Sequence, residues 1–139
     1  MRSPSDYLLD EQIGYLLRRV TQRHLAIFSA RIPEVTTTQW AAMARLLQAG
    51  PLTQNLLGRE TAMDAATIKG VVDRLVRDGF VATSPDPSDR RRLIVDLTEA
   101  GRAFCLSGLA AAAQVSDETL APLDAAERRQ VLALLERLV

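Results

Sequence analysis

The segment 53–97 constrains the fold more than any other part of the sequence, because local signals for two helices and a hairpin follow one another there. Thr53 can cap a short helix over residues 54–60, and Asp64 can cap a second helix, DAATIKGVVDRLVRDG. The character of the chain changes at Phe80, where FVATS and RLIVDL, both short and rich in β-branched residues, flank the turn-forming PDPSDR. The predicted order of short helix, tight turn, capped helix and β-hairpin is that of a helix-turn-helix followed by a wing.

Two further helices are predicted before this segment. Residues 7–30 carry apolar side chains at the three-and-four spacing of a helix with one buried stripe, and Pro33 ends that helix. The next helix opens with Thr36 and Gln39, a capping-box pair in which each side chain satisfies an N–H at the helix start, and it closes at Gly50.

Two helices are also predicted after the hairpin. Thr98 caps one that runs to about Leu120, and Asp124 with Glu127 forms a second capping box that starts the last helix. The sequence therefore predicts a mainly α fold with a small β-hairpin wing, a winged helix-turn-helix flanked by N- and C-terminal helices.

Composition excludes several classes of site. The chain of 139 residues holds one cysteine, Cys105, and one histidine, His24, so an intramolecular disulfide framework and a Cys/His zinc site are both excluded. A secretory leader and an uncharged run of the ~20 residues that cross a bilayer are not evident, which favours a cytoplasmic protein. Neither a Ser-His-Asp pattern nor a glycine-rich phosphate loop is present, and we expect neither an enzyme nor a bound cofactor or metal.

The distribution of charge matters more than its total. Lys plus Arg and Asp plus Glu both number 17, so net charge gives no argument for a nucleic-acid partner. Three consecutive arginines nevertheless lie at the tip of the predicted hairpin, in DPSDRRRLIVDLT. A narrow minor groove concentrates negative potential, and a weakly hydrated guanidinium suits it, so the arginines indicate a DNA-contacting wing tip. The alternative is an ordinary solvated turn.

The segment from Leu52 to Gly101 resembles the MarR family of bacterial winged-helix regulators. The family's wing signature is approximately D-x-R, an apolar strand and L-T-x-x-G, and the residues that match it here are Asp89, Arg91, Leu97, Thr98 and Gly101. LTQNLLGRETAMDAATIKGVVDRLVRDGFV also looks like the family's helix-turn-helix.

This resemblance implies a homodimer that binds a pseudo-palindromic operator as a repressor. Residues 1–35 and 99–139 would form the dimerisation region and residues 36–98 the DNA-binding domain. Two half-sites on one face of the duplex would lie about one helical turn, ~34 to 36 Å, apart. The last helix independently carries leucines over several faces, more apolar surface than one small lobe is expected to cover.

The resemblance and the small-residue start of the second helix together assign the DNA contacts. Thr67 can donate to a phosphate or meet a thymine methyl, and Lys69 can reach a base or a phosphate. Asp89 is expected to orient an arginine, while Asp73 and Arg74 are expected to pair within the fold. The predicted core face of the helix comprises Ile68, Val71, Val72, Leu75 and Val76. The predicted DNA-binding residues are Ala65, Ala66, Thr67, Lys69, Gly70, Arg90, Arg91 and Arg92.

Members of the family often hold a small aromatic or phenolic acid, and the resemblance implies such an effector here. Arg18 would clamp its carboxylate, His24 would take its hydroxyl and Trp40 would stack on its ring. His24 is otherwise a satisfied core histidine, and Arg19 and Arg23 are expected in solvent or at the dimer edge.

Two alternative functions stay open on the sequence. Some family members sense oxidants through a cysteine, but Cys105 lies among apolar neighbours and is expected to be a packing residue. The zero net charge also permits a winged helix that binds protein instead of DNA.

Overall fold

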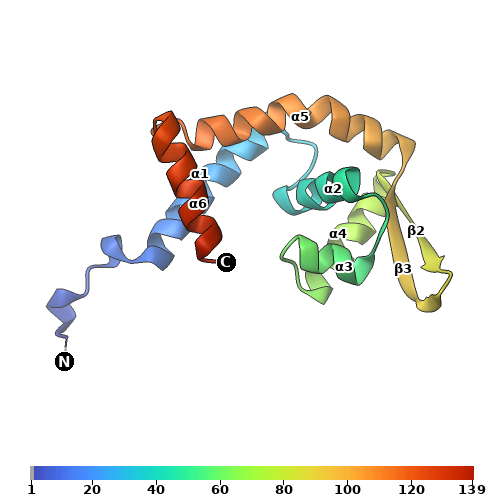
Figure 1. Ribbon diagram of the computed structural model, residues 1–139, viewed down its shortest axis with the longest axis horizontal. Coiled ribbons are helices and arrows are strands. Elements are labelled where there is room, and N and C mark those ends of the chain that lie inside the picture. The colour runs from blue at the N-terminus through green and yellow to red at the C-terminus, as the bar shows by residue number, and fades with distance from the viewer. Residues whose placement is uncertain (1) are drawn as a thin grey trace. The chain divides into compact units, whose positions relative to one another are not determined.

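The computed structural model describes residues 2–139 and is mainly α-helical with a small β-hairpin wing, as predicted, and a third strand extends the hairpin to a three-stranded sheet (Figure 1). Two compact units divide the chain: the first combines the chain up to Arg31 with residues 111–139, and the second comprises residues 32–110. The predicted assignment of 1–35, 36–98 and 99–139 to dimerisation and DNA-binding regions stays a prediction. In chain order, the elements are η1 (Pro4–Asp6), η2 (Leu9–Glu11), α1 (Ile13–Arg31), α2 (Thr37–Ala49), β1 (Leu52–Thr53), α3 (Gln54–Glu60), α4 (Ala65–Arg77), β2 (Val81–Asp86), β3 (Asp89–Leu97), α5 (Glu99–Thr119) and α6 (Ala125–Arg137).

The first helix begins at Ile13, and the prediction that it starts at residue 7 is wrong. Two 3₁₀ turns precede it, and Tyr7, Leu8 and Leu9 are each more than half exposed. Helix propensity alone is marginal in water, so a segment that has no apolar surface to pack against does not extend the helix.

The predicted helix starts are confirmed by their caps. The Thr36 hydroxyl accepts from the Gln39 N–H at 3.2 Å, and the Gln39 side chain accepts from the Thr36 N–H at 2.8 Å. Asp124 and Glu127 form the second capping box in the same way. Because each cap satisfies N–H groups that the helix leaves without partners, it fixes where the helix begins.

The sheet has the order β1-β3-β2 and is antiparallel throughout. β1 was not predicted, and it pairs Leu52 with Val95 on β3. The strands of the hairpin are longer than predicted, so that only Pro87 and Ser88 lie between them, within the predicted turn PDPSDR. β2 is an edge strand. It therefore tolerates the proline within SPD, which has no N–H to donate to a neighbouring strand.

The core of the second unit lies where α2, α3 and α4 meet β3. Met43, Leu57, Leu75 and Val95 are completely buried there. Four of the five predicted core residues of α4 are buried, but Val76 is 42% exposed, so its prediction as a core residue is wrong. The strongly amphipathic α4 therefore turns one face inward and leaves the opposite face free.

The first unit is built from α1, the end of α5 and α6 (Figure 1). Arg31 of α1 donates to Gln114 at 2.9 Å and forms an ion pair with Glu118, both on α5. A bilayer-crossing helix, which would need a long apolar stretch, does not occur among residues 2–139. Several apolar side chains of α1, of α6 and of the residue that caps α6 remain 39 to 69% exposed, among them Leu16, Leu17, Val20, Leu132, Leu134, Leu135 and Leu138.

Candidate nucleic-acid interface

The start of α4 is held by its cap. The Asp64 carboxylate accepts from the Thr67 N–H at 2.7 Å, and this hydrogen bond lowers the pKa of Asp64 below its ordinary value. Ala65, Ala66 and Thr67 are exposed in the first turn, and Gly70 is half-buried one turn further on. The helix therefore presents small side chains that allow close approach of a partner surface.

Lys69 lies on the same exposed side of α4 and forms an ion pair with Asp73, with 2.8 Å between Nζ and Oδ2. The expectation that Asp73 pairs within the fold is confirmed by this ion pair with a residue one helical turn away. Both side chains are more than 60% exposed, and such surface pairs contribute only ~0 to 1 kcal/mol. Lys69 can exchange Asp73 for a phosphate at little cost.

The three arginines lie on β3 instead of in the turn, and all three are exposed. Arg91 Nε is 3.2 Å from Asp89 Oδ1, and Arg92 Nε is 3.5 Å from Asp89 Oδ2. The Arg91 side chain lowers the pKa of Asp89 by hydrogen bonding to it, with a smaller contribution from the charge of Arg92. The expectation that Asp89 orients an arginine is confirmed.

The hairpin turn is held by Asp86. Its carboxylate accepts from the Ser88 N–H at 3.0 Å and from the Ser88 hydroxyl at 2.8 Å, and these bonds lower the pKa of Asp86. Side-chain bonding of this kind is an Asx turn, which fixes the backbone locally. The backbone from which Arg90, Arg91 and Arg92 extend is therefore held in a defined conformation at the turn.

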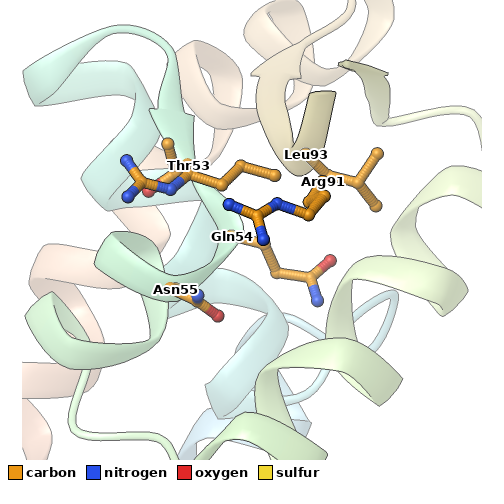
Figure 2. Close-up of a pocket in the computed structure, with 6 residues that line it drawn as sticks. Thr53, Gln54, Asn55, Arg91 and Leu93 are labelled. Carbon is orange, nitrogen blue, oxygen red and sulfur yellow. The ribbon is translucent and has the colours of Figure 1, made fainter. Parts of the chain in front are cut away.

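A small recess lies between the start of α3 and β3 (Figure 2). Figure 2 shows Arg91 reaching from β3 toward Gln54 and Asn55, which lie on the first turn of α3. Gln54 and Asn55 were not predicted as site residues. Their signal in the sequence is that they directly follow the cap Thr53, and the bond from the Leu56 N–H to that hydroxyl, 3.3 Å long, confirms the cap. Amide and guanidinium N–H groups gathered at one recess can all donate to the oxygens of a phosphate.

His24 makes a hydrogen bond that fixes its tautomer. Its Nδ1 lies 2.8 Å from the Thr119 hydroxyl, which itself donates to the Val115 carbonyl at 2.8 Å. Because the hydroxyl has one hydrogen, it accepts from Nδ1–H, and the Nε2 of neutral His24 keeps its lone pair. His24 also lines a largely apolar cavity of about 330 Å³ in the first unit, together with Ser116 and residues of α6.

Neither of the other two candidate effector residues lines this cavity. Arg18 is exposed on α1 and does not line this cavity, and Trp40 belongs to the second unit, where its ring packs edge-on against Phe104. Arg23 was expected in solvent or at a dimer edge. Arg23 is exposed, in agreement with this expectation, and it also donates to the carbonyls of Thr119 at 2.6 Å and Glu118 at 2.8 Å, which stabilises the C-terminal end of α5.

Cys105 is completely buried on α5, and burial raises the pKa of its thiol. The thiolate is the reactive form of cysteine, so this environment favours a packing role over oxidant sensing.

A capped helix of small exposed residues beside an arginine-bearing hairpin defines the class of winged helix-turn-helix DNA-binding proteins. Comparison with known proteins agrees. The model of the MarR family matches residues 35–93. The HTH-type transcriptional repressor NicR of Pseudomonas putida is 42% identical over 96% of this chain and 85% of its own length.

Solved structures are similar over nearly the whole chain. A "probable transcriptional regulator" of Pseudomonas aeruginosa is 52% identical, with a TM-score of 0.92 over 95% of this chain and 100% of that one. BpsR of Bordetella bronchiseptica, whose DNA binding is described as regulated by 6-hydroxynicotinic acid, is 38% identical, with a TM-score of 0.91 over 95% of this chain and 96% of its own. The chain belongs to the MarR family of winged-helix transcriptional repressors.

Proposed function

We propose that the protein is a homodimeric repressor whose affinity for a pseudo-palindromic operator is lowered by an aromatic carboxylic acid that carries a hydroxyl group. The observation that carries the DNA-binding part is the recess in which Arg91 meets the first turn of α3 beside the exposed start of α4. The similarity to BpsR supports the class of effector, since its DNA binding is described as regulated by such an acid.

The homodimer is proposed from exposed apolar surface. Leu16 and Leu17 on α1 and Leu132 and Leu134 on α6 are between 40 and 56% exposed. An apolar patch of this extent on a soluble protein marks an interaction site, and a second copy of the same unit can cover it. The dimer then presents two copies of α4 to one duplex.

DNA recognition is divided between two elements of each protomer. Ala65, Ala66, Thr67, Lys69 and Gly70 would face base edges and phosphates in the major groove. Arg91 would enter the minor groove with Arg90, and Arg92 would contact a phosphate. Gln54 and Asn55 would add phosphate contacts beside Arg91, because the first helix of such a motif crosses the DNA backbone.

The effector is proposed to meet two residues of α1. Arg18 would bind the carboxylate by charge-assisted hydrogen bonds. His24 Nε2 would accept the proton of the hydroxyl, since Nδ1–H is already bonded to Thr119. Stacking of Trp40 on the ring of the effector stays a prediction.

Fluorescence anisotropy tests the proposal with a labelled duplex from the region upstream of the protein's own gene. We expect 6-hydroxynicotinic acid to weaken binding by roughly 5- to 150-fold, the range of an ordinary coupling free energy. Nicotinic acid, which lacks the hydroxyl, is the matched ligand control and should act less. The His24→Ala variant should bind DNA as before and lose the difference between the two acids.

The parts of the proposal fail separately in this assay. Binding of duplex that no hydroxylated aromatic acid weakens would refute the effector and leave the repressor intact. Failure to retain duplex even at low salt would instead favour the alternative of a protein-interaction module.

A further inference from the structure

Three aromatic rings form a continuous row within the second unit. Trp40 of α2 packs edge-on against Phe104 of α5, with ring centroids 6.3 Å apart and planes inclined by 67°. Phe104 in turn stacks on Phe80 with a centroid distance of 4.8 Å and an angle of 30°. We call Trp40, Phe104 and Phe80 the aromatic row. All three side chains are partly buried, and each pair of rings has a favourable geometry.

One end of the row is the junction between the recognition helix and the wing. Phe80 lies between the end of α4 and the start of β2, and its N–H donates to the Leu75 carbonyl of α4 at 2.9 Å. Its carbonyl accepts from the Thr98 N–H at 3.0 Å, and the Thr98 hydroxyl donates to the Gly79 carbonyl at 2.6 Å. The segment 79–80 is therefore fixed to α4, to β2 and to the start of α5 at once.

The other end of the row is wedged between α2 and α5. A Cβ added to Gly108 would lie 3.0 Å from the Trp40 ring, so glycine there is what admits the indole. Gly108 is one turn beyond Phe104 on α5, which means that Trp40 spans two successive turns of that helix. The ring cannot shift along α5 without disturbing Phe104, because close-packed interiors transmit displacement.

We infer that Phe104 is a positioning residue for DNA binding. Through Phe80, it couples Trp40 on α2 to the junction between α4 and β2, where the wing begins. Phe104 makes no contact with the proposed DNA surface. It sets the angle at which α4 and β2 leave their junction, and hence where Lys69 and Arg91 stand relative to each other. By reciprocity of coupling, docking of DNA on α4 and the wing changes the surroundings of Trp40.

The chain provides its own reporter, because Trp40 is its single tryptophan. Saturation of the purified protein with the upstream duplex should shift the emission of Trp40. In Phe104→Leu the shift should fall by at least half, and affinity for the duplex should fall roughly fivefold or more. Phe104→Tyr keeps the ring and should restore both. Phe28→Leu is the matched control, since Phe28 is 5% exposed on α1 and outside the row.

A second measurement needs no DNA. Because Cys105 is completely buried, Ala82→Cys on β2, opposite the exposed Asp96, gives one accessible thiol for a nitroxide label. Adding Phe104→Leu should increase the mobility of the label in the electron paramagnetic resonance spectrum while the circular dichroism stays unchanged. If Phe104→Leu does not fold, Gly108→Ala displaces Trp40 more gently and should produce the same changes to a smaller degree.

The inference is overturned by one set of results. These are identical label spectra with and without the row substitution, together with a DNA-induced Trp40 shift that Phe104→Leu leaves intact. Because neither readout involves a small molecule, both test the inference whether or not the effector proposal is correct.

Discussion

Gly101 is the residue whose replacement the structure predicts most sharply. It lies in the first turn of α5, where the helix packs directly on the backbone of Phe80. A Cβ built on Gly101 would lie 1.9 Å from the Phe80 carbonyl oxygen and 2.8 Å from the carbonyl carbon. Because both atoms are backbone, no side chain can rotate away, and α5 must retreat by roughly 1.5 Å to reach ordinary contact.

The expected cost of Gly101→Ala combines opposing effects. Overpacking against rigid neighbours costs about 1 to 3 kcal/mol. The retreat also breaks the two hydrogen bonds from Thr98 to Gly79 and Phe80, each contributing about 1 kcal/mol. Alanine returns about 1 kcal/mol of helix propensity. The net loss should be about 2 to 4 kcal/mol of unfolding free energy.

Urea unfolding followed by circular dichroism measures this loss. Protein concentration must be held constant between variants, because the apparent stability of the proposed dimer would depend on it. Gly70→Ala is the control, since the nearest atom to its added Cβ is the flexible Arg74 guanidinium at 3.6 Å. That variant should gain about 0.5 to 1 kcal/mol. A Gly101→Ala protein as stable as wild type would refute the close packing of α5 on Phe80.

Three further predictions follow from single features. Arg91→Ala should weaken duplex binding and reduce the slope of log affinity against log salt concentration by about two, one for each protomer of the proposed dimer, whereas Arg137→Ala at the end of α6 should change neither; an equal effect of both would remove the wing assignment. The pKa values of Asp64, Asp86 and Asp89 are lowered in the folded protein, so these groups stabilise it above the ordinary aspartate pKa, and this stability is lost as pH falls through the lowered values. The unfolding free energy should therefore decline from about pH 4 downward, and it should decline less steeply in Asp86→Asn. Cys105 should resist a thiol reagent in the native protein and react only in urea; rapid native reaction would reopen the oxidant-sensing alternative.

Local signals in the sequence predicted the helix starts, because a cap and its partner lie within three residues. Thr36 with Gln39 and Asp124 with Glu127 are examples, and the structure confirms both. β1 could not be predicted, since two residues carry no alternation and pair with β3 only because the chain returns there some forty positions later. The prediction of where the first helix starts was wrong, because the spacing of apolar residues does not reveal whether they have another surface to pack against.

The same contrast holds for the site. The arginines and the orienting Asp89 lie within a few residues of one another, so their grouping was visible in the sequence. The bonds of His24 and Arg23 to Thr119 join positions 95 or more residues apart, and the stacking of Phe80 on Phe104 depends on the path of α5. Such contacts follow from tertiary structure and leave no local pattern.

Hydroxyl-radical footprinting of the wild-type protein on the duplex from upstream of its own gene tests most directly whether two winged helix-turn-helix motifs bind one operator. We expect two protected patches on one face of the DNA, about one helical turn apart, each beside a minor-groove protection that disappears in Arg91→Ala. A single unrepeated patch, or minor-groove protection that Arg91→Ala leaves unchanged, would contradict the dimeric wing-and-helix mode of binding.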